Sequence, residues 1–486
     1  MKTYIGMDLG TSGLKMLLVT ADGSILAENT QTYPVSYPHP GWSEQNPEDW
    51  YAAALRGLAQ LLAGQDASGV GGISFGGQMH GLVALDGSDN VIRPAILWND
   101  GRTEEETQYL NEVIGKEKLS AWTGNIAFAG FTAPKLLWMK KHEPENFAKI
   151  AKIMLPKDYL AYRLSGAFST DFSDASGMLL LDVKNRRWSR EMCDVCGISE
   201  QMLPQLHESY EVVGTLRQEI AGKFGLKDVK IIAGAGDNAA AAVGTGVVGE
   251  GGCNISLGTS GTLFVSSASY KEDKVNALHS FCHADGGWHL MGCILSAASC
   301  NSWWVNGILQ STDYKKEEAG LDEFLGKNDV YFLPYLMGER SPHNDVTARG
   351  AFIGMRPDTT RGMMTLAMLE GVTFALRDCL EAAKKNGAVI PRTKLCGGGA
   401  KSKLWRKIVA NVMNLPVDIP QTEQGPGFGA AMLAMVGCGE YQTVQEAADA
   451  IVRVKETVLP DSDIAAQYEE RYRHFTKLYP ALKGLF

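Results

Sequence analysis

Positive charge, long apolar runs and paired cysteines are all scarce in this sequence of 486 residues. Lys and Arg number 46 against 55 Asp and Glu, which gives a net charge of −9 and argues against a dedicated nucleic-acid binder, because such proteins carry a basic face. No apolar run approaches the roughly 18–20 residues of a membrane span. The first residues, MKTYIGMDLG, contain an acid and early glycines, unlike a signal peptide. We therefore expect a cytoplasmic protein without nucleic-acid or membrane partners.

Cysteines and metal-ligand spacings are equally sparse. The nine cysteines are an odd number spread over a long chain, which favours free thiols over a disulfide framework. Cys193 and Cys196 form the only CxxC motif, and a zinc site would need a second pair nearby. The sequence also has no HExxH and no GxxxxGK[ST] motif. These absences argue against a zinc hydrolase and against a P-loop kinase.

Glycine, in contrast, is abundant and clustered. The chain has 54 glycines, about 11% against a usual ~7%. Two clusters form a repeat, because residues 8–13 read DLGTSG and residues 256–261 read SLGTSG. β-like runs flank both copies, so each predicts a strand, a Gly-Thr-Ser-Gly turn and a second strand. The shared context at half-chain spacing indicates two related domains.

The remaining signals alternate between strands and helices, which predicts an α/β fold. A helix start is expected at Asn46, followed by Pro47 and two acids, with an apolar stripe at Trp50, Ala54, Leu58 and Leu61. We expect strands at 70–76, 81–85, 229–235 and 393–397, and helices from about 238 and over 363–385, 402–413 and 427–436, with a helical end over 443–486. The repeat places two domains at residues 1–246 and 247–486.

Three glycine-rich turns, at 10–13, 258–261 and 397–399, are suited to binding anions. Glycine lets successive backbone amides face one anion, so two such turns in repeated domains would clamp a polyphosphate between them. Any single turn is also compatible with an ordinary hairpin.

Two acids lie beside these turns. Asp8 ends the strand that enters the first turn, with Lys15 expected at the same turn, and a carboxylate there suits a divalent cation such as Mg²⁺. Asp237 follows Gly236 at a predicted strand end. It is placed either to cap the next helix or to accept a hydroxyl proton beside a phosphoryl donor.

Two polar segments also follow predicted strands. Met79 and His80 lie in the turn 76–81, outside a strand end, where ligands of α/β proteins bind. Trp98, Asp100 and Arg102 form a second group, which either binds a sugar or orders a loop.

Two further motif matches are excluded by their context. GxGxxG at 244–249 follows an alanine-rich helix and not a strand, so it does not predict a dinucleotide site. GxSxG around Ser74 is followed by a glycine-rich turn and a strand, whereas a nucleophile elbow needs a helix.

Over nearly its whole length the sequence resembles the FGGY carbohydrate kinases of the actin-like ATPase superfamily. The resemblance is carried by DLGTSGLK (8–15), GWSEQNPEDWY (41–51), ILWNDGR (96–102), FTAPKLLWMKKHE (131–143), GAGDNAAAAVG (234–244), SLGTSGT (256–262), GERSPHNDVTARGAFIG (338–354), CGGGAKSKLW (396–405) and GFGAAMLA (427–434). Within the family, GGQMHG, LPKDYL (155–160) and GDNAAAAVG are most similar to members that phosphorylate D-xylulose.

The resemblance implies two actin-like (ribonuclease H-like) domains around a deep cleft. It also implies transfer of the γ-phosphoryl group of MgATP to the 5-hydroxyl of D-xylulose, with Asp237 as the general base and Asp8 as the metal-associated acid. By the same resemblance, the sugar is lined by Met79, His80, Asp237 and Asn238, and the phosphates by Thr11, Ser12, Lys15, Gly258 and Thr259. The nucleoside lies against Gly398, Gly399 and Ala400. A homodimer is compatible with the family.

Two alternatives stay open from the sequence. The chain is compatible with a kinase of the same family for another ketose or polyol, such as ribulose, fuculose or glycerol. From a different class, it is compatible with a nucleotide-driven binding protein on the actin fold, although no separate peptide-binding domain is visible in the sequence.

Overall fold

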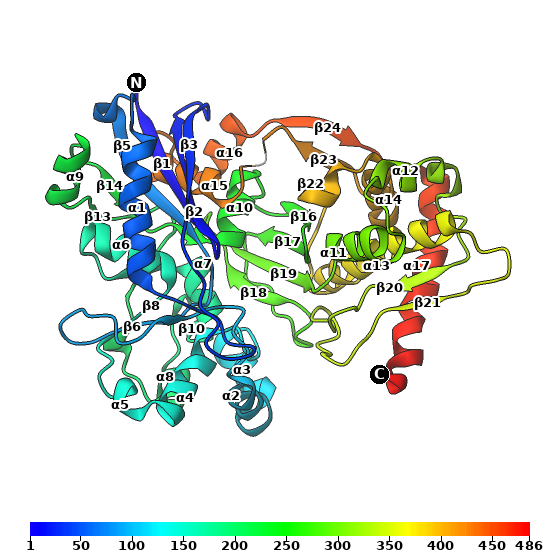
Figure 1. The fold of residues 1–486 in the computed structure, drawn as a ribbon, viewed down its shortest axis with the longest axis horizontal. Helices are drawn as coiled ribbons and strands as arrows, with labels where there is room; N and C mark the ends of the chain where they lie inside the picture. Colours follow the sequence, from blue (N-terminus) through cyan, green and yellow to red (C-terminus); the bar gives the residue numbers. More distant parts are fainter. Residues whose placement is uncertain (423) are drawn as a thin grey trace.

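Two mixed sheets, one in each half of the chain, form the framework of the molecule (Figure 1). The computed structural model describes residues 1–422 and 424–486. The first sheet has the order β13-β14-β5-β1-β2-β3, and β15 also pairs with β5. Its strands are β1 Thr3–Leu9, β2 Gly13–Thr20, β3 Ile25–Thr32, β5 Val70–Gly77, β13 Val212–Thr215, β14 Lys230–Ile232 and β15 Ala235–Gly236.

The second sheet repeats this topology. Its order is β18-β19-β17-β16-β22-β23-β24. In both sheets the central strand pairs antiparallel with the strand after the Gly-Thr-Ser-Gly turn and parallel with the strand on its other side. The predicted strand, turn and strand are therefore confirmed in both copies. The strands are β16 Cys253–Leu257, β17 Gly261–Ser267, β18 His279–Cys282, β19 Trp288–Ile294, β22 Thr393–Cys396, β23 Val417–Pro420 and β24 Val454–Val458.

Helix α1, Pro47–Leu61, begins where the sequence predicts it. The Asn46 side chain caps the helix by accepting a hydrogen bond from the Glu48 amide. The four predicted apolar positions are fully buried against the first sheet. Their spacing gives one apolar face, which is the reason that this segment folds as a surface helix.

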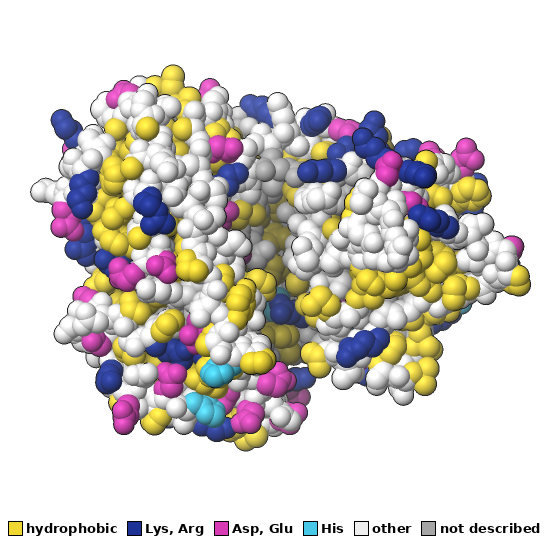
Figure 2. All heavy atoms as spheres, in the orientation of Figure 1, with side chains coloured by type: hydrophobic (Ala, Val, Ile, Leu, Met, Phe, Trp, Pro, Cys, Tyr) yellow, Lys and Arg dark blue, Asp and Glu magenta, His cyan; other side chains and the backbone are white. Residues whose placement is uncertain are grey.

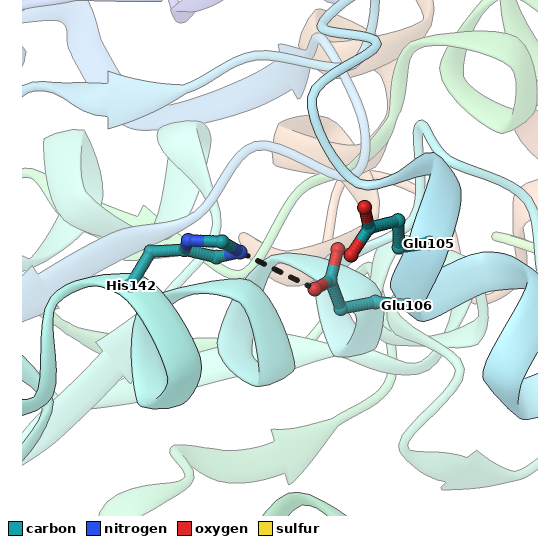
Figure 3. A group of neighbouring side chains, drawn as sticks. All are labelled: Glu105, Glu106 and His142. Carbon is teal, nitrogen blue, oxygen red and sulfur yellow. Dashed lines mark ion pairs between the residues drawn. The ribbon is translucent and has the colours of Figure 1, made fainter.

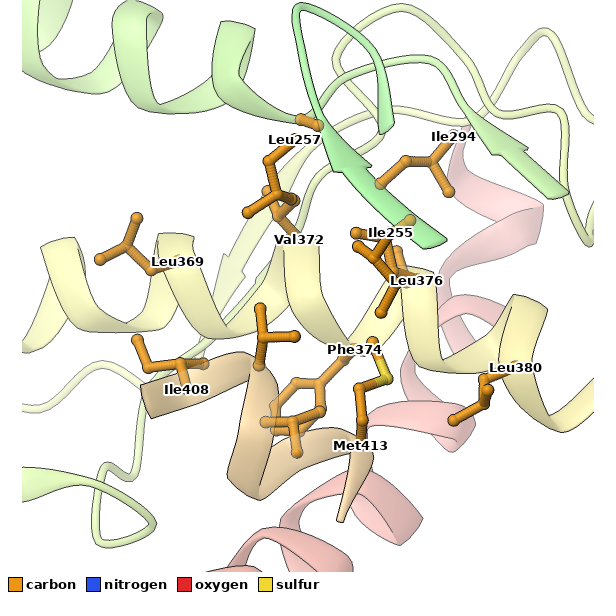
Figure 4. Close-up of a cluster of buried hydrophobic side chains, with 14 of the residues drawn as sticks. Ile255, Leu257, Ile294, Leu369, Val372, Phe374, Leu376, Leu380, Ile408 and Met413 are labelled. Carbon is orange, nitrogen blue, oxygen red and sulfur yellow. The ribbon is translucent and has the colours of Figure 1, made fainter. Parts of the chain in front are cut away.

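The core of the second half lies around a long central helix (Figure 4). Helix α13, Arg361–Lys385, is buried along most of its length, as the expected helix over 363–385 implies. Its residues Leu369, Val372 and Phe374 pack beside β16 and beside helix α14, Lys403–Met413, with helix α17, Ser462–Leu482, in the same cluster. This rigid layer supports the second glycine-rich turn.

Helix α15, Pro426–Gly437, belongs to the second half by sequence but packs on the first sheet. Close approach of backbones allows this. A Cβ atom at Gly6 of β1 would lie 1.8 Å from the Gly427 carbonyl oxygen, and one at Gly429 would lie 1.8 Å from the Ala240 carbonyl oxygen of helix α10, Asp237–Gly244. Part of the glycine excess therefore serves the packing of helices α10 and α15 behind the strand ends.

Two local expectations need correction. The C-terminal stretch is not helical throughout, because strand β24 separates helix α16, Val444–Ile451, from helix α17. Strand β24 is a mostly exposed edge strand, so it lacks the apolar alternation that predicts a strand. Lys15 lies within β2, opposite Asp8 of β1, and not in the turn.

In the part of the chain that the structure describes, no helix is both long and apolar enough to cross a membrane.

Candidate active site

The ends of three parallel strands bring the two predicted acids to one place. In the register of the first sheet, Asp8 of β1 and Ala235 of β15 both pair with Gly76 of β5, from opposite sides. Asp237 follows β15 directly, as the first residue of α10. Because carboxyl ends of parallel strands meet at one edge, Asp8 and Asp237 flank the end of β5. A hollow separates the two halves of the molecule in Figure 2.

The environment of both acids disfavours their charged forms. Burial raises the pKa of Asp237 to about 6. Burial, and then the charge of Asp237, raises the pKa of Asp8 to about 7, against the opposing effect of Lys15. Within residues 1–422 and 424–486, no group donates a hydrogen bond to the Asp8 carboxylate. Asp237 accepts two hydrogen bonds from Asn238 through Oδ1 alone. The Asp8 carboxylate and Asp237 Oδ2 are therefore a suitable donor set for Mg²⁺, which prefers oxygen ligands and retains water molecules.

The first glycine-rich turn is held by side chains of later segments. The Gly10 carbonyl accepts a hydrogen bond from the Tyr33 hydroxyl at 2.5 Å, and the Thr11 carbonyl accepts one from Gln45 Nε2 at 2.7 Å. The Thr11 hydroxyl donates to Gln78 Oε1 at 3.1 Å and accepts from Trp98 Nε1 at 3.0 Å. Thr11 therefore connects the expected phosphate loop to the turn that carries Met79 and His80.

Two further residues predicted for this loop lie in different surroundings. Ser12 is exposed at the tip of the turn. Lys15 Nζ lies 2.5 Å from Gln424 Oε1 and 3.7 Å from a carboxylate oxygen of Glu28. The lysine therefore lies between the first turn and the segment that leads into α15.

The turn after β5 holds His80 in a defined orientation. His80 has a φ of 70°, and its ring stacks on Phe131 at 4.6 Å. Nδ1 lies 2.7 Å from the Gly177 carbonyl oxygen. Burial is the main cause that lowers the pKa of His80 to about 3, so the ring is neutral. Since Nδ1 faces a carbonyl, it carries the proton, and Nε2 is left as an acceptor for a ligand hydroxyl.

Helix α4, Thr132–His142, contacts the same turn through hydrogen bonds to its backbone. The His80 carbonyl oxygen accepts hydrogen bonds from the Thr132 hydroxyl at 3.0 Å and from Lys135 Nζ at 2.8 Å. Lys135 is fully buried, and burial lowers its pKa to about 7. The segment 131–143, whose sequence contributed to the family resemblance, thus acts in the fold by positioning His80.

Met79 and Asn238 lie side by side between the turn and α10. Met79 Sδ is 3.8 Å from Asn238 Nδ2, and a Cβ atom at Gly236 would lie 3.0 Å from the Met79 side chain. Met79 is 5% exposed and contributes an apolar surface to the site. Asn238 is half-buried beside Asp237. The four residues predicted for the sugar site are therefore brought together.

A buried charge cluster that sequence reasoning missed lies beneath Asp237. Lys157 of helix α6, Pro156–Ser165, has Nζ 2.6 Å from Asp158, 2.8 Å from Asp171 and 3.7 Å from Asp174, and all four side chains are inaccessible to solvent. Burial is the main cause that raises the pKa of Asp174, with Asp158 and Asp237 adding to it. Three acids share one cation here, so the charged form of Asp174 is disfavoured.

This cluster reaches the end of β15 through a serine. Asp171 accepts hydrogen bonds from the Ser173 amide at 2.8 Å and from its hydroxyl at 2.5 Å. The Ser173 hydroxyl oxygen accepts one from the Gly236 amide at 3.1 Å. Gly236 immediately precedes Asp237, so the cluster fixes the backbone that carries the acid. The KD pair in LPKDYL was the only signal in the sequence.

A cavity of about 950 Å³ lies against the second glycine-rich turn. It combines backbone of both later turns with aromatic side chains, which suits a nucleoside and its phosphates. The predicted residues Gly258, Thr259, Gly398 and Gly399 all line it, together with Ser299, Asn301, Trp303, Tyr314, Lys315, Glu318 and Trp405. Ala400 differs, because it is buried behind the turn and its carbonyl accepts a hydrogen bond from Arg406.

A smaller cavity of about 240 Å³ lies between α10 and the second sheet. Its walls include Asn238, Asn254, Ser256, Thr262 and Gly397. Gly397 adjoins Gly398, which lines the larger cavity. The two cavities therefore have neighbouring residues of one turn in their walls.

The second polar segment divides into two parts. Arg102 is 1% exposed in its side chain and forms ion pairs with Asp100 and Glu44, each at 2.7 Å. Its guanidinium also lies 3.6 Å from the centre of the Trp42 ring. Asp100 and Arg102 thus order the loop, whereas Trp98 is 46% exposed and faces the first turn.

One surface group has a geometry compatible with a metal ion (Figure 3). Glu105 and Glu106 of helix α2, Glu104–Gln108, point toward His142 at the end of α4. Lys141 Nζ lies 2.6 Å from Glu105 and 3.9 Å from Glu106. Because the lysine already balances these charges, we assign no metal to this group.

The structure also supports the exclusion of the misleading motifs. Ser74 is buried inside β5 and has no helix after it. The segment 244–249 follows helix α10. Cys193 and Cys196 are buried free thiols of helix α8, Arg190–Cys196.

Comparison with known proteins gives two family matches. Residues 3–244 match the description "FGGY family of carbohydrate kinases, N-terminal domain", and residues 253–438 match the corresponding C-terminal domain. A xylulose kinase of Escherichia coli strain K12 is 41% identical over 99% of both chains. Among solved structures, a protein from Brucella ovis described as a xyloylose kinase is 41% identical with a TM-score of 0.95 over both full chains. A gluconate kinase from Lactobacillus acidophilus is 26% identical with a TM-score of 0.94 over 99% of this chain and 98% of that one.

Proposed function

The chain belongs to the FGGY family of carbohydrate kinases, with their actin-like two-domain fold, and on this premise we propose that it phosphorylates D-xylulose at the 5-hydroxyl. The reaction consumes ATP and releases D-xylulose 5-phosphate and ADP. One observation carries the proposal: Met79, His80, Asp237 and Asn238 converge at one strand edge, in a chain that is similar over its full length to a xylulose kinase.

In this proposal Asp237 acts as the general base. The sugar 5-oxygen forms a bond to the γ-phosphorus while the bond from that phosphorus to the β–γ bridging oxygen breaks, and the hydroxyl proton passes to Asp237. A base in this role must be ionised at neutral pH, and a pKa of about 6 makes it a stronger proton acceptor than an ordinary aspartate. Ser173 and the buried cluster behind it keep Asp237 in place.

The anionic phosphates are received by backbone and by one lysine. The turns at 10–13 and 258–261 offer amides, with Thr11, Ser12, Gly258 and Thr259 at their tips, and Lys15 supplies a positive charge. Gly398 and Gly399 carry the nucleoside, with Ala400 behind them. Asp8 would hold Mg²⁺, which neutralises phosphate charge when bound.

The same proposal includes a division into domains 1–246 and 247–486, with α15 exchanged onto the first sheet. It also includes a cytoplasmic location and a homodimer. Light scattering of the purified chain tests the dimer, because a mass of 52.6 kDa instead of twice that value would contradict it.

A panel of acceptors tests the proposed substrate. ADP release in a coupled assay is measured with D-xylulose, D-ribulose, L-fuculose, glycerol and D-gluconate, and the Asp237→Ala variant serves as the control for contaminating kinases. We expect the highest kcat/KM with D-xylulose. A clear preference for another acceptor would refute the substrate while leaving the family intact, and ATP-dependent protein binding without acceptor-stimulated turnover would refute the kinase itself.

A further inference from the structure

One arginine of the second half faces the sugar site without an acidic partner. Arg340 is half-buried, and its guanidinium lies 5.2 Å from the centre of the Phe128 ring. Within residues 1–422 and 424–486, no carboxylate forms an ion pair with it, although most other half-buried arginines of the chain have one, such as Arg93 with Glu44 and Arg186 with Glu208. A half-buried arginine without a counter-charge has donors available for a ligand.

The backbone on both sides of Arg340 is fixed. The buried Glu339 carboxylate accepts hydrogen bonds from the Leu295 amide at 2.9 Å and from the Arg340 amide at 2.8 Å. The Ser341 amide donates a hydrogen bond to the Cys293 carbonyl of β19 at 3.0 Å, and the Ser341 hydroxyl oxygen accepts one from the Cys293 amide at 3.1 Å. The side chain therefore extends from a rigid support and does not belong to a loose loop.

The surface that Arg340 faces is equally well fixed. Phe128 lies 5.4 Å from Phe131, on which the His80 ring stacks, and 5.1 Å from His279 of β18. The Asn125 side chain donates to the Ser280 carbonyl at 2.9 Å and accepts from the Ser280 amide at 3.1 Å. This pair of bonds locks the loop of the first half against β18. Arg340 thus extends from the second half over aromatic residues that adjoin His80.

Arg340 lies on the His80 side of the site, beside the aromatic residues that adjoin that ring. Its charge contributes, after burial, to the lowered pKa values of His80 and His279. The pKa of Asp237 is set instead by burial and by the Asn238 amide. A sugar whose reacting hydroxyl meets Asp237 and whose chain passes Met79 and His80 would present its other end to Arg340.

We propose that Arg340 is a specificity-determining residue that binds the ketone end of the acceptor, donating hydrogen bonds to the carbonyl oxygen at C2 and to the hydroxyl oxygen at C1. This inference rests on the proposed function. The planar guanidinium has paired donors that match two neighbouring acceptors, and the α-hydroxyketone end of an open-chain ketose has such a pair. A polyol lacks the carbonyl, so Arg340 would distinguish a ketose from the corresponding alcohol.

The test compares Arg340→Gln and Arg340→Lys with the wild-type enzyme on two acceptors that differ only at C2. D-xylulose has the carbonyl and xylitol has a hydroxyl; xylitol is measured both as an acceptor and as a competitive inhibitor. We expect Arg340→Gln to lower kcat/KM for D-xylulose by about tenfold or more, mainly through KM, because one charge-assisted pair is lost. The kcat/KM and the inhibition constant of xylitol should change by less than about threefold, and KM for ATP should stay constant. Arg340→Lys should lose less activity on D-xylulose than Arg340→Gln without reaching the wild-type value.

Arg356→Gln is the matched control, since Arg356 lies in an exposed pair with Asp329. Thermal unfolding of all variants shows whether the fold is retained. If the wild type phosphorylates D-xylulose and Arg340→Gln has the same kcat/KM, the inference is overturned and the proposed function stands. The same conclusion follows if Arg340→Gln loses equally on both acceptors. Absence of wild-type activity on D-xylulose would instead refute the proposed function.

Discussion

Replacement of Asp237 by Asn should remove activity and at the same time stabilise the protein. Asn has the same shape as Asp, and its oxygen atom can still accept the hydrogen bonds from the Asn238 amide at 2.7 Å and from Asn238 Nδ2 at 3.0 Å. The substitution therefore removes a negative charge and a proton acceptor without changing the local packing. Both consequences are large enough to measure separately.

The expected gain in stability follows from the raised pKa. A rise from the ordinary 3.8 to about 6 corresponds to about 3 kcal/mol at ~1.4 kcal/mol per pKa unit. Because the carboxylate is not fully buried, we expect about 1–2 kcal/mol after discounting for solvent screening. The folded state holds its proton more tightly than the unfolded state, so the wild-type protein loses this stability as the pH rises from about 4 to about 6. Asp237→Asn avoids the loss.

Urea unfolding at several pH values checks the stability, and the coupled ADP assay checks the activity. The free energy of unfolding of Asp237→Asn should match that of the wild type below about pH 4 and exceed it above about pH 6. Asp228→Asn is the control, since this acid is exposed, and its difference from the wild type should stay flat. We expect kcat to fall at least about a thousandfold, as for loss of a general base together with charge positioning. A constant stability difference would refute the reasoning on the buried charge, and activity above a few per cent of the wild type would remove Asp237 as the base.

Three further substitutions address the support of the site, the nucleotide cavity and the core. Ser173→Ala removes the acceptor of the Gly236 amide and should lower kcat by about tenfold with little change in KM for either substrate; an unchanged kcat would show that the buried cluster does not position Asp237. Gly398→Val places a side chain where a Cβ atom meets no neighbour within 4 Å, in the lining of the larger cavity. It should therefore raise KM for ATP without changing the melting temperature, and normal ATP kinetics would contradict the cavity's role. Phe374→Ala removes most of a core side chain that is 1% exposed and should lower the free energy of unfolding in urea by about 3–5 kcal/mol. A loss below about 1 kcal/mol would mean that the core relaxes around the substitution.

The sequence was sufficient for features that depend on local rules. The repeated Gly-Thr-Ser-Gly turn predicted strand, turn and strand in both halves, and Asn46 with Pro47 predicted the start of α1. Asp8 and Asp237 could each be assigned to the end of a strand, and strand ends gather at one edge of a sheet. Each of these inferences needs only a short segment and a period of two or 3.6 residues.

Features that depend on distant contacts could not be predicted in this way. The packing of α15 on β1 joins Gly6 to Gly427, and no local pattern indicates which sheet a helix will cover. The cluster beneath Asp237 joins Lys157 to Asp174 and then to Gly236. Its members are individually common polar residues that become informative only when the fold buries them together.

The symmetry of the two sheets does not extend to the charges at their strand ends. Asp8 in the first copy of the repeat corresponds to Ser256 in the second, and Ser256 lines the small cavity between the halves. Burial, and then the charge of Asp237, already raises the pKa of Asp8, so a third carboxylate at position 256 would make the cleft less favourable for polyphosphate. At about 4 Å, each such contact would cost about 1 kcal/mol in water and more in a protein cleft. In the proposed mechanism, one side of the cleft holds the cation and the base, while the other side contributes neutral hydroxyls and backbone amides. This division of charge would give the structural repeat a direction for phosphoryl transfer.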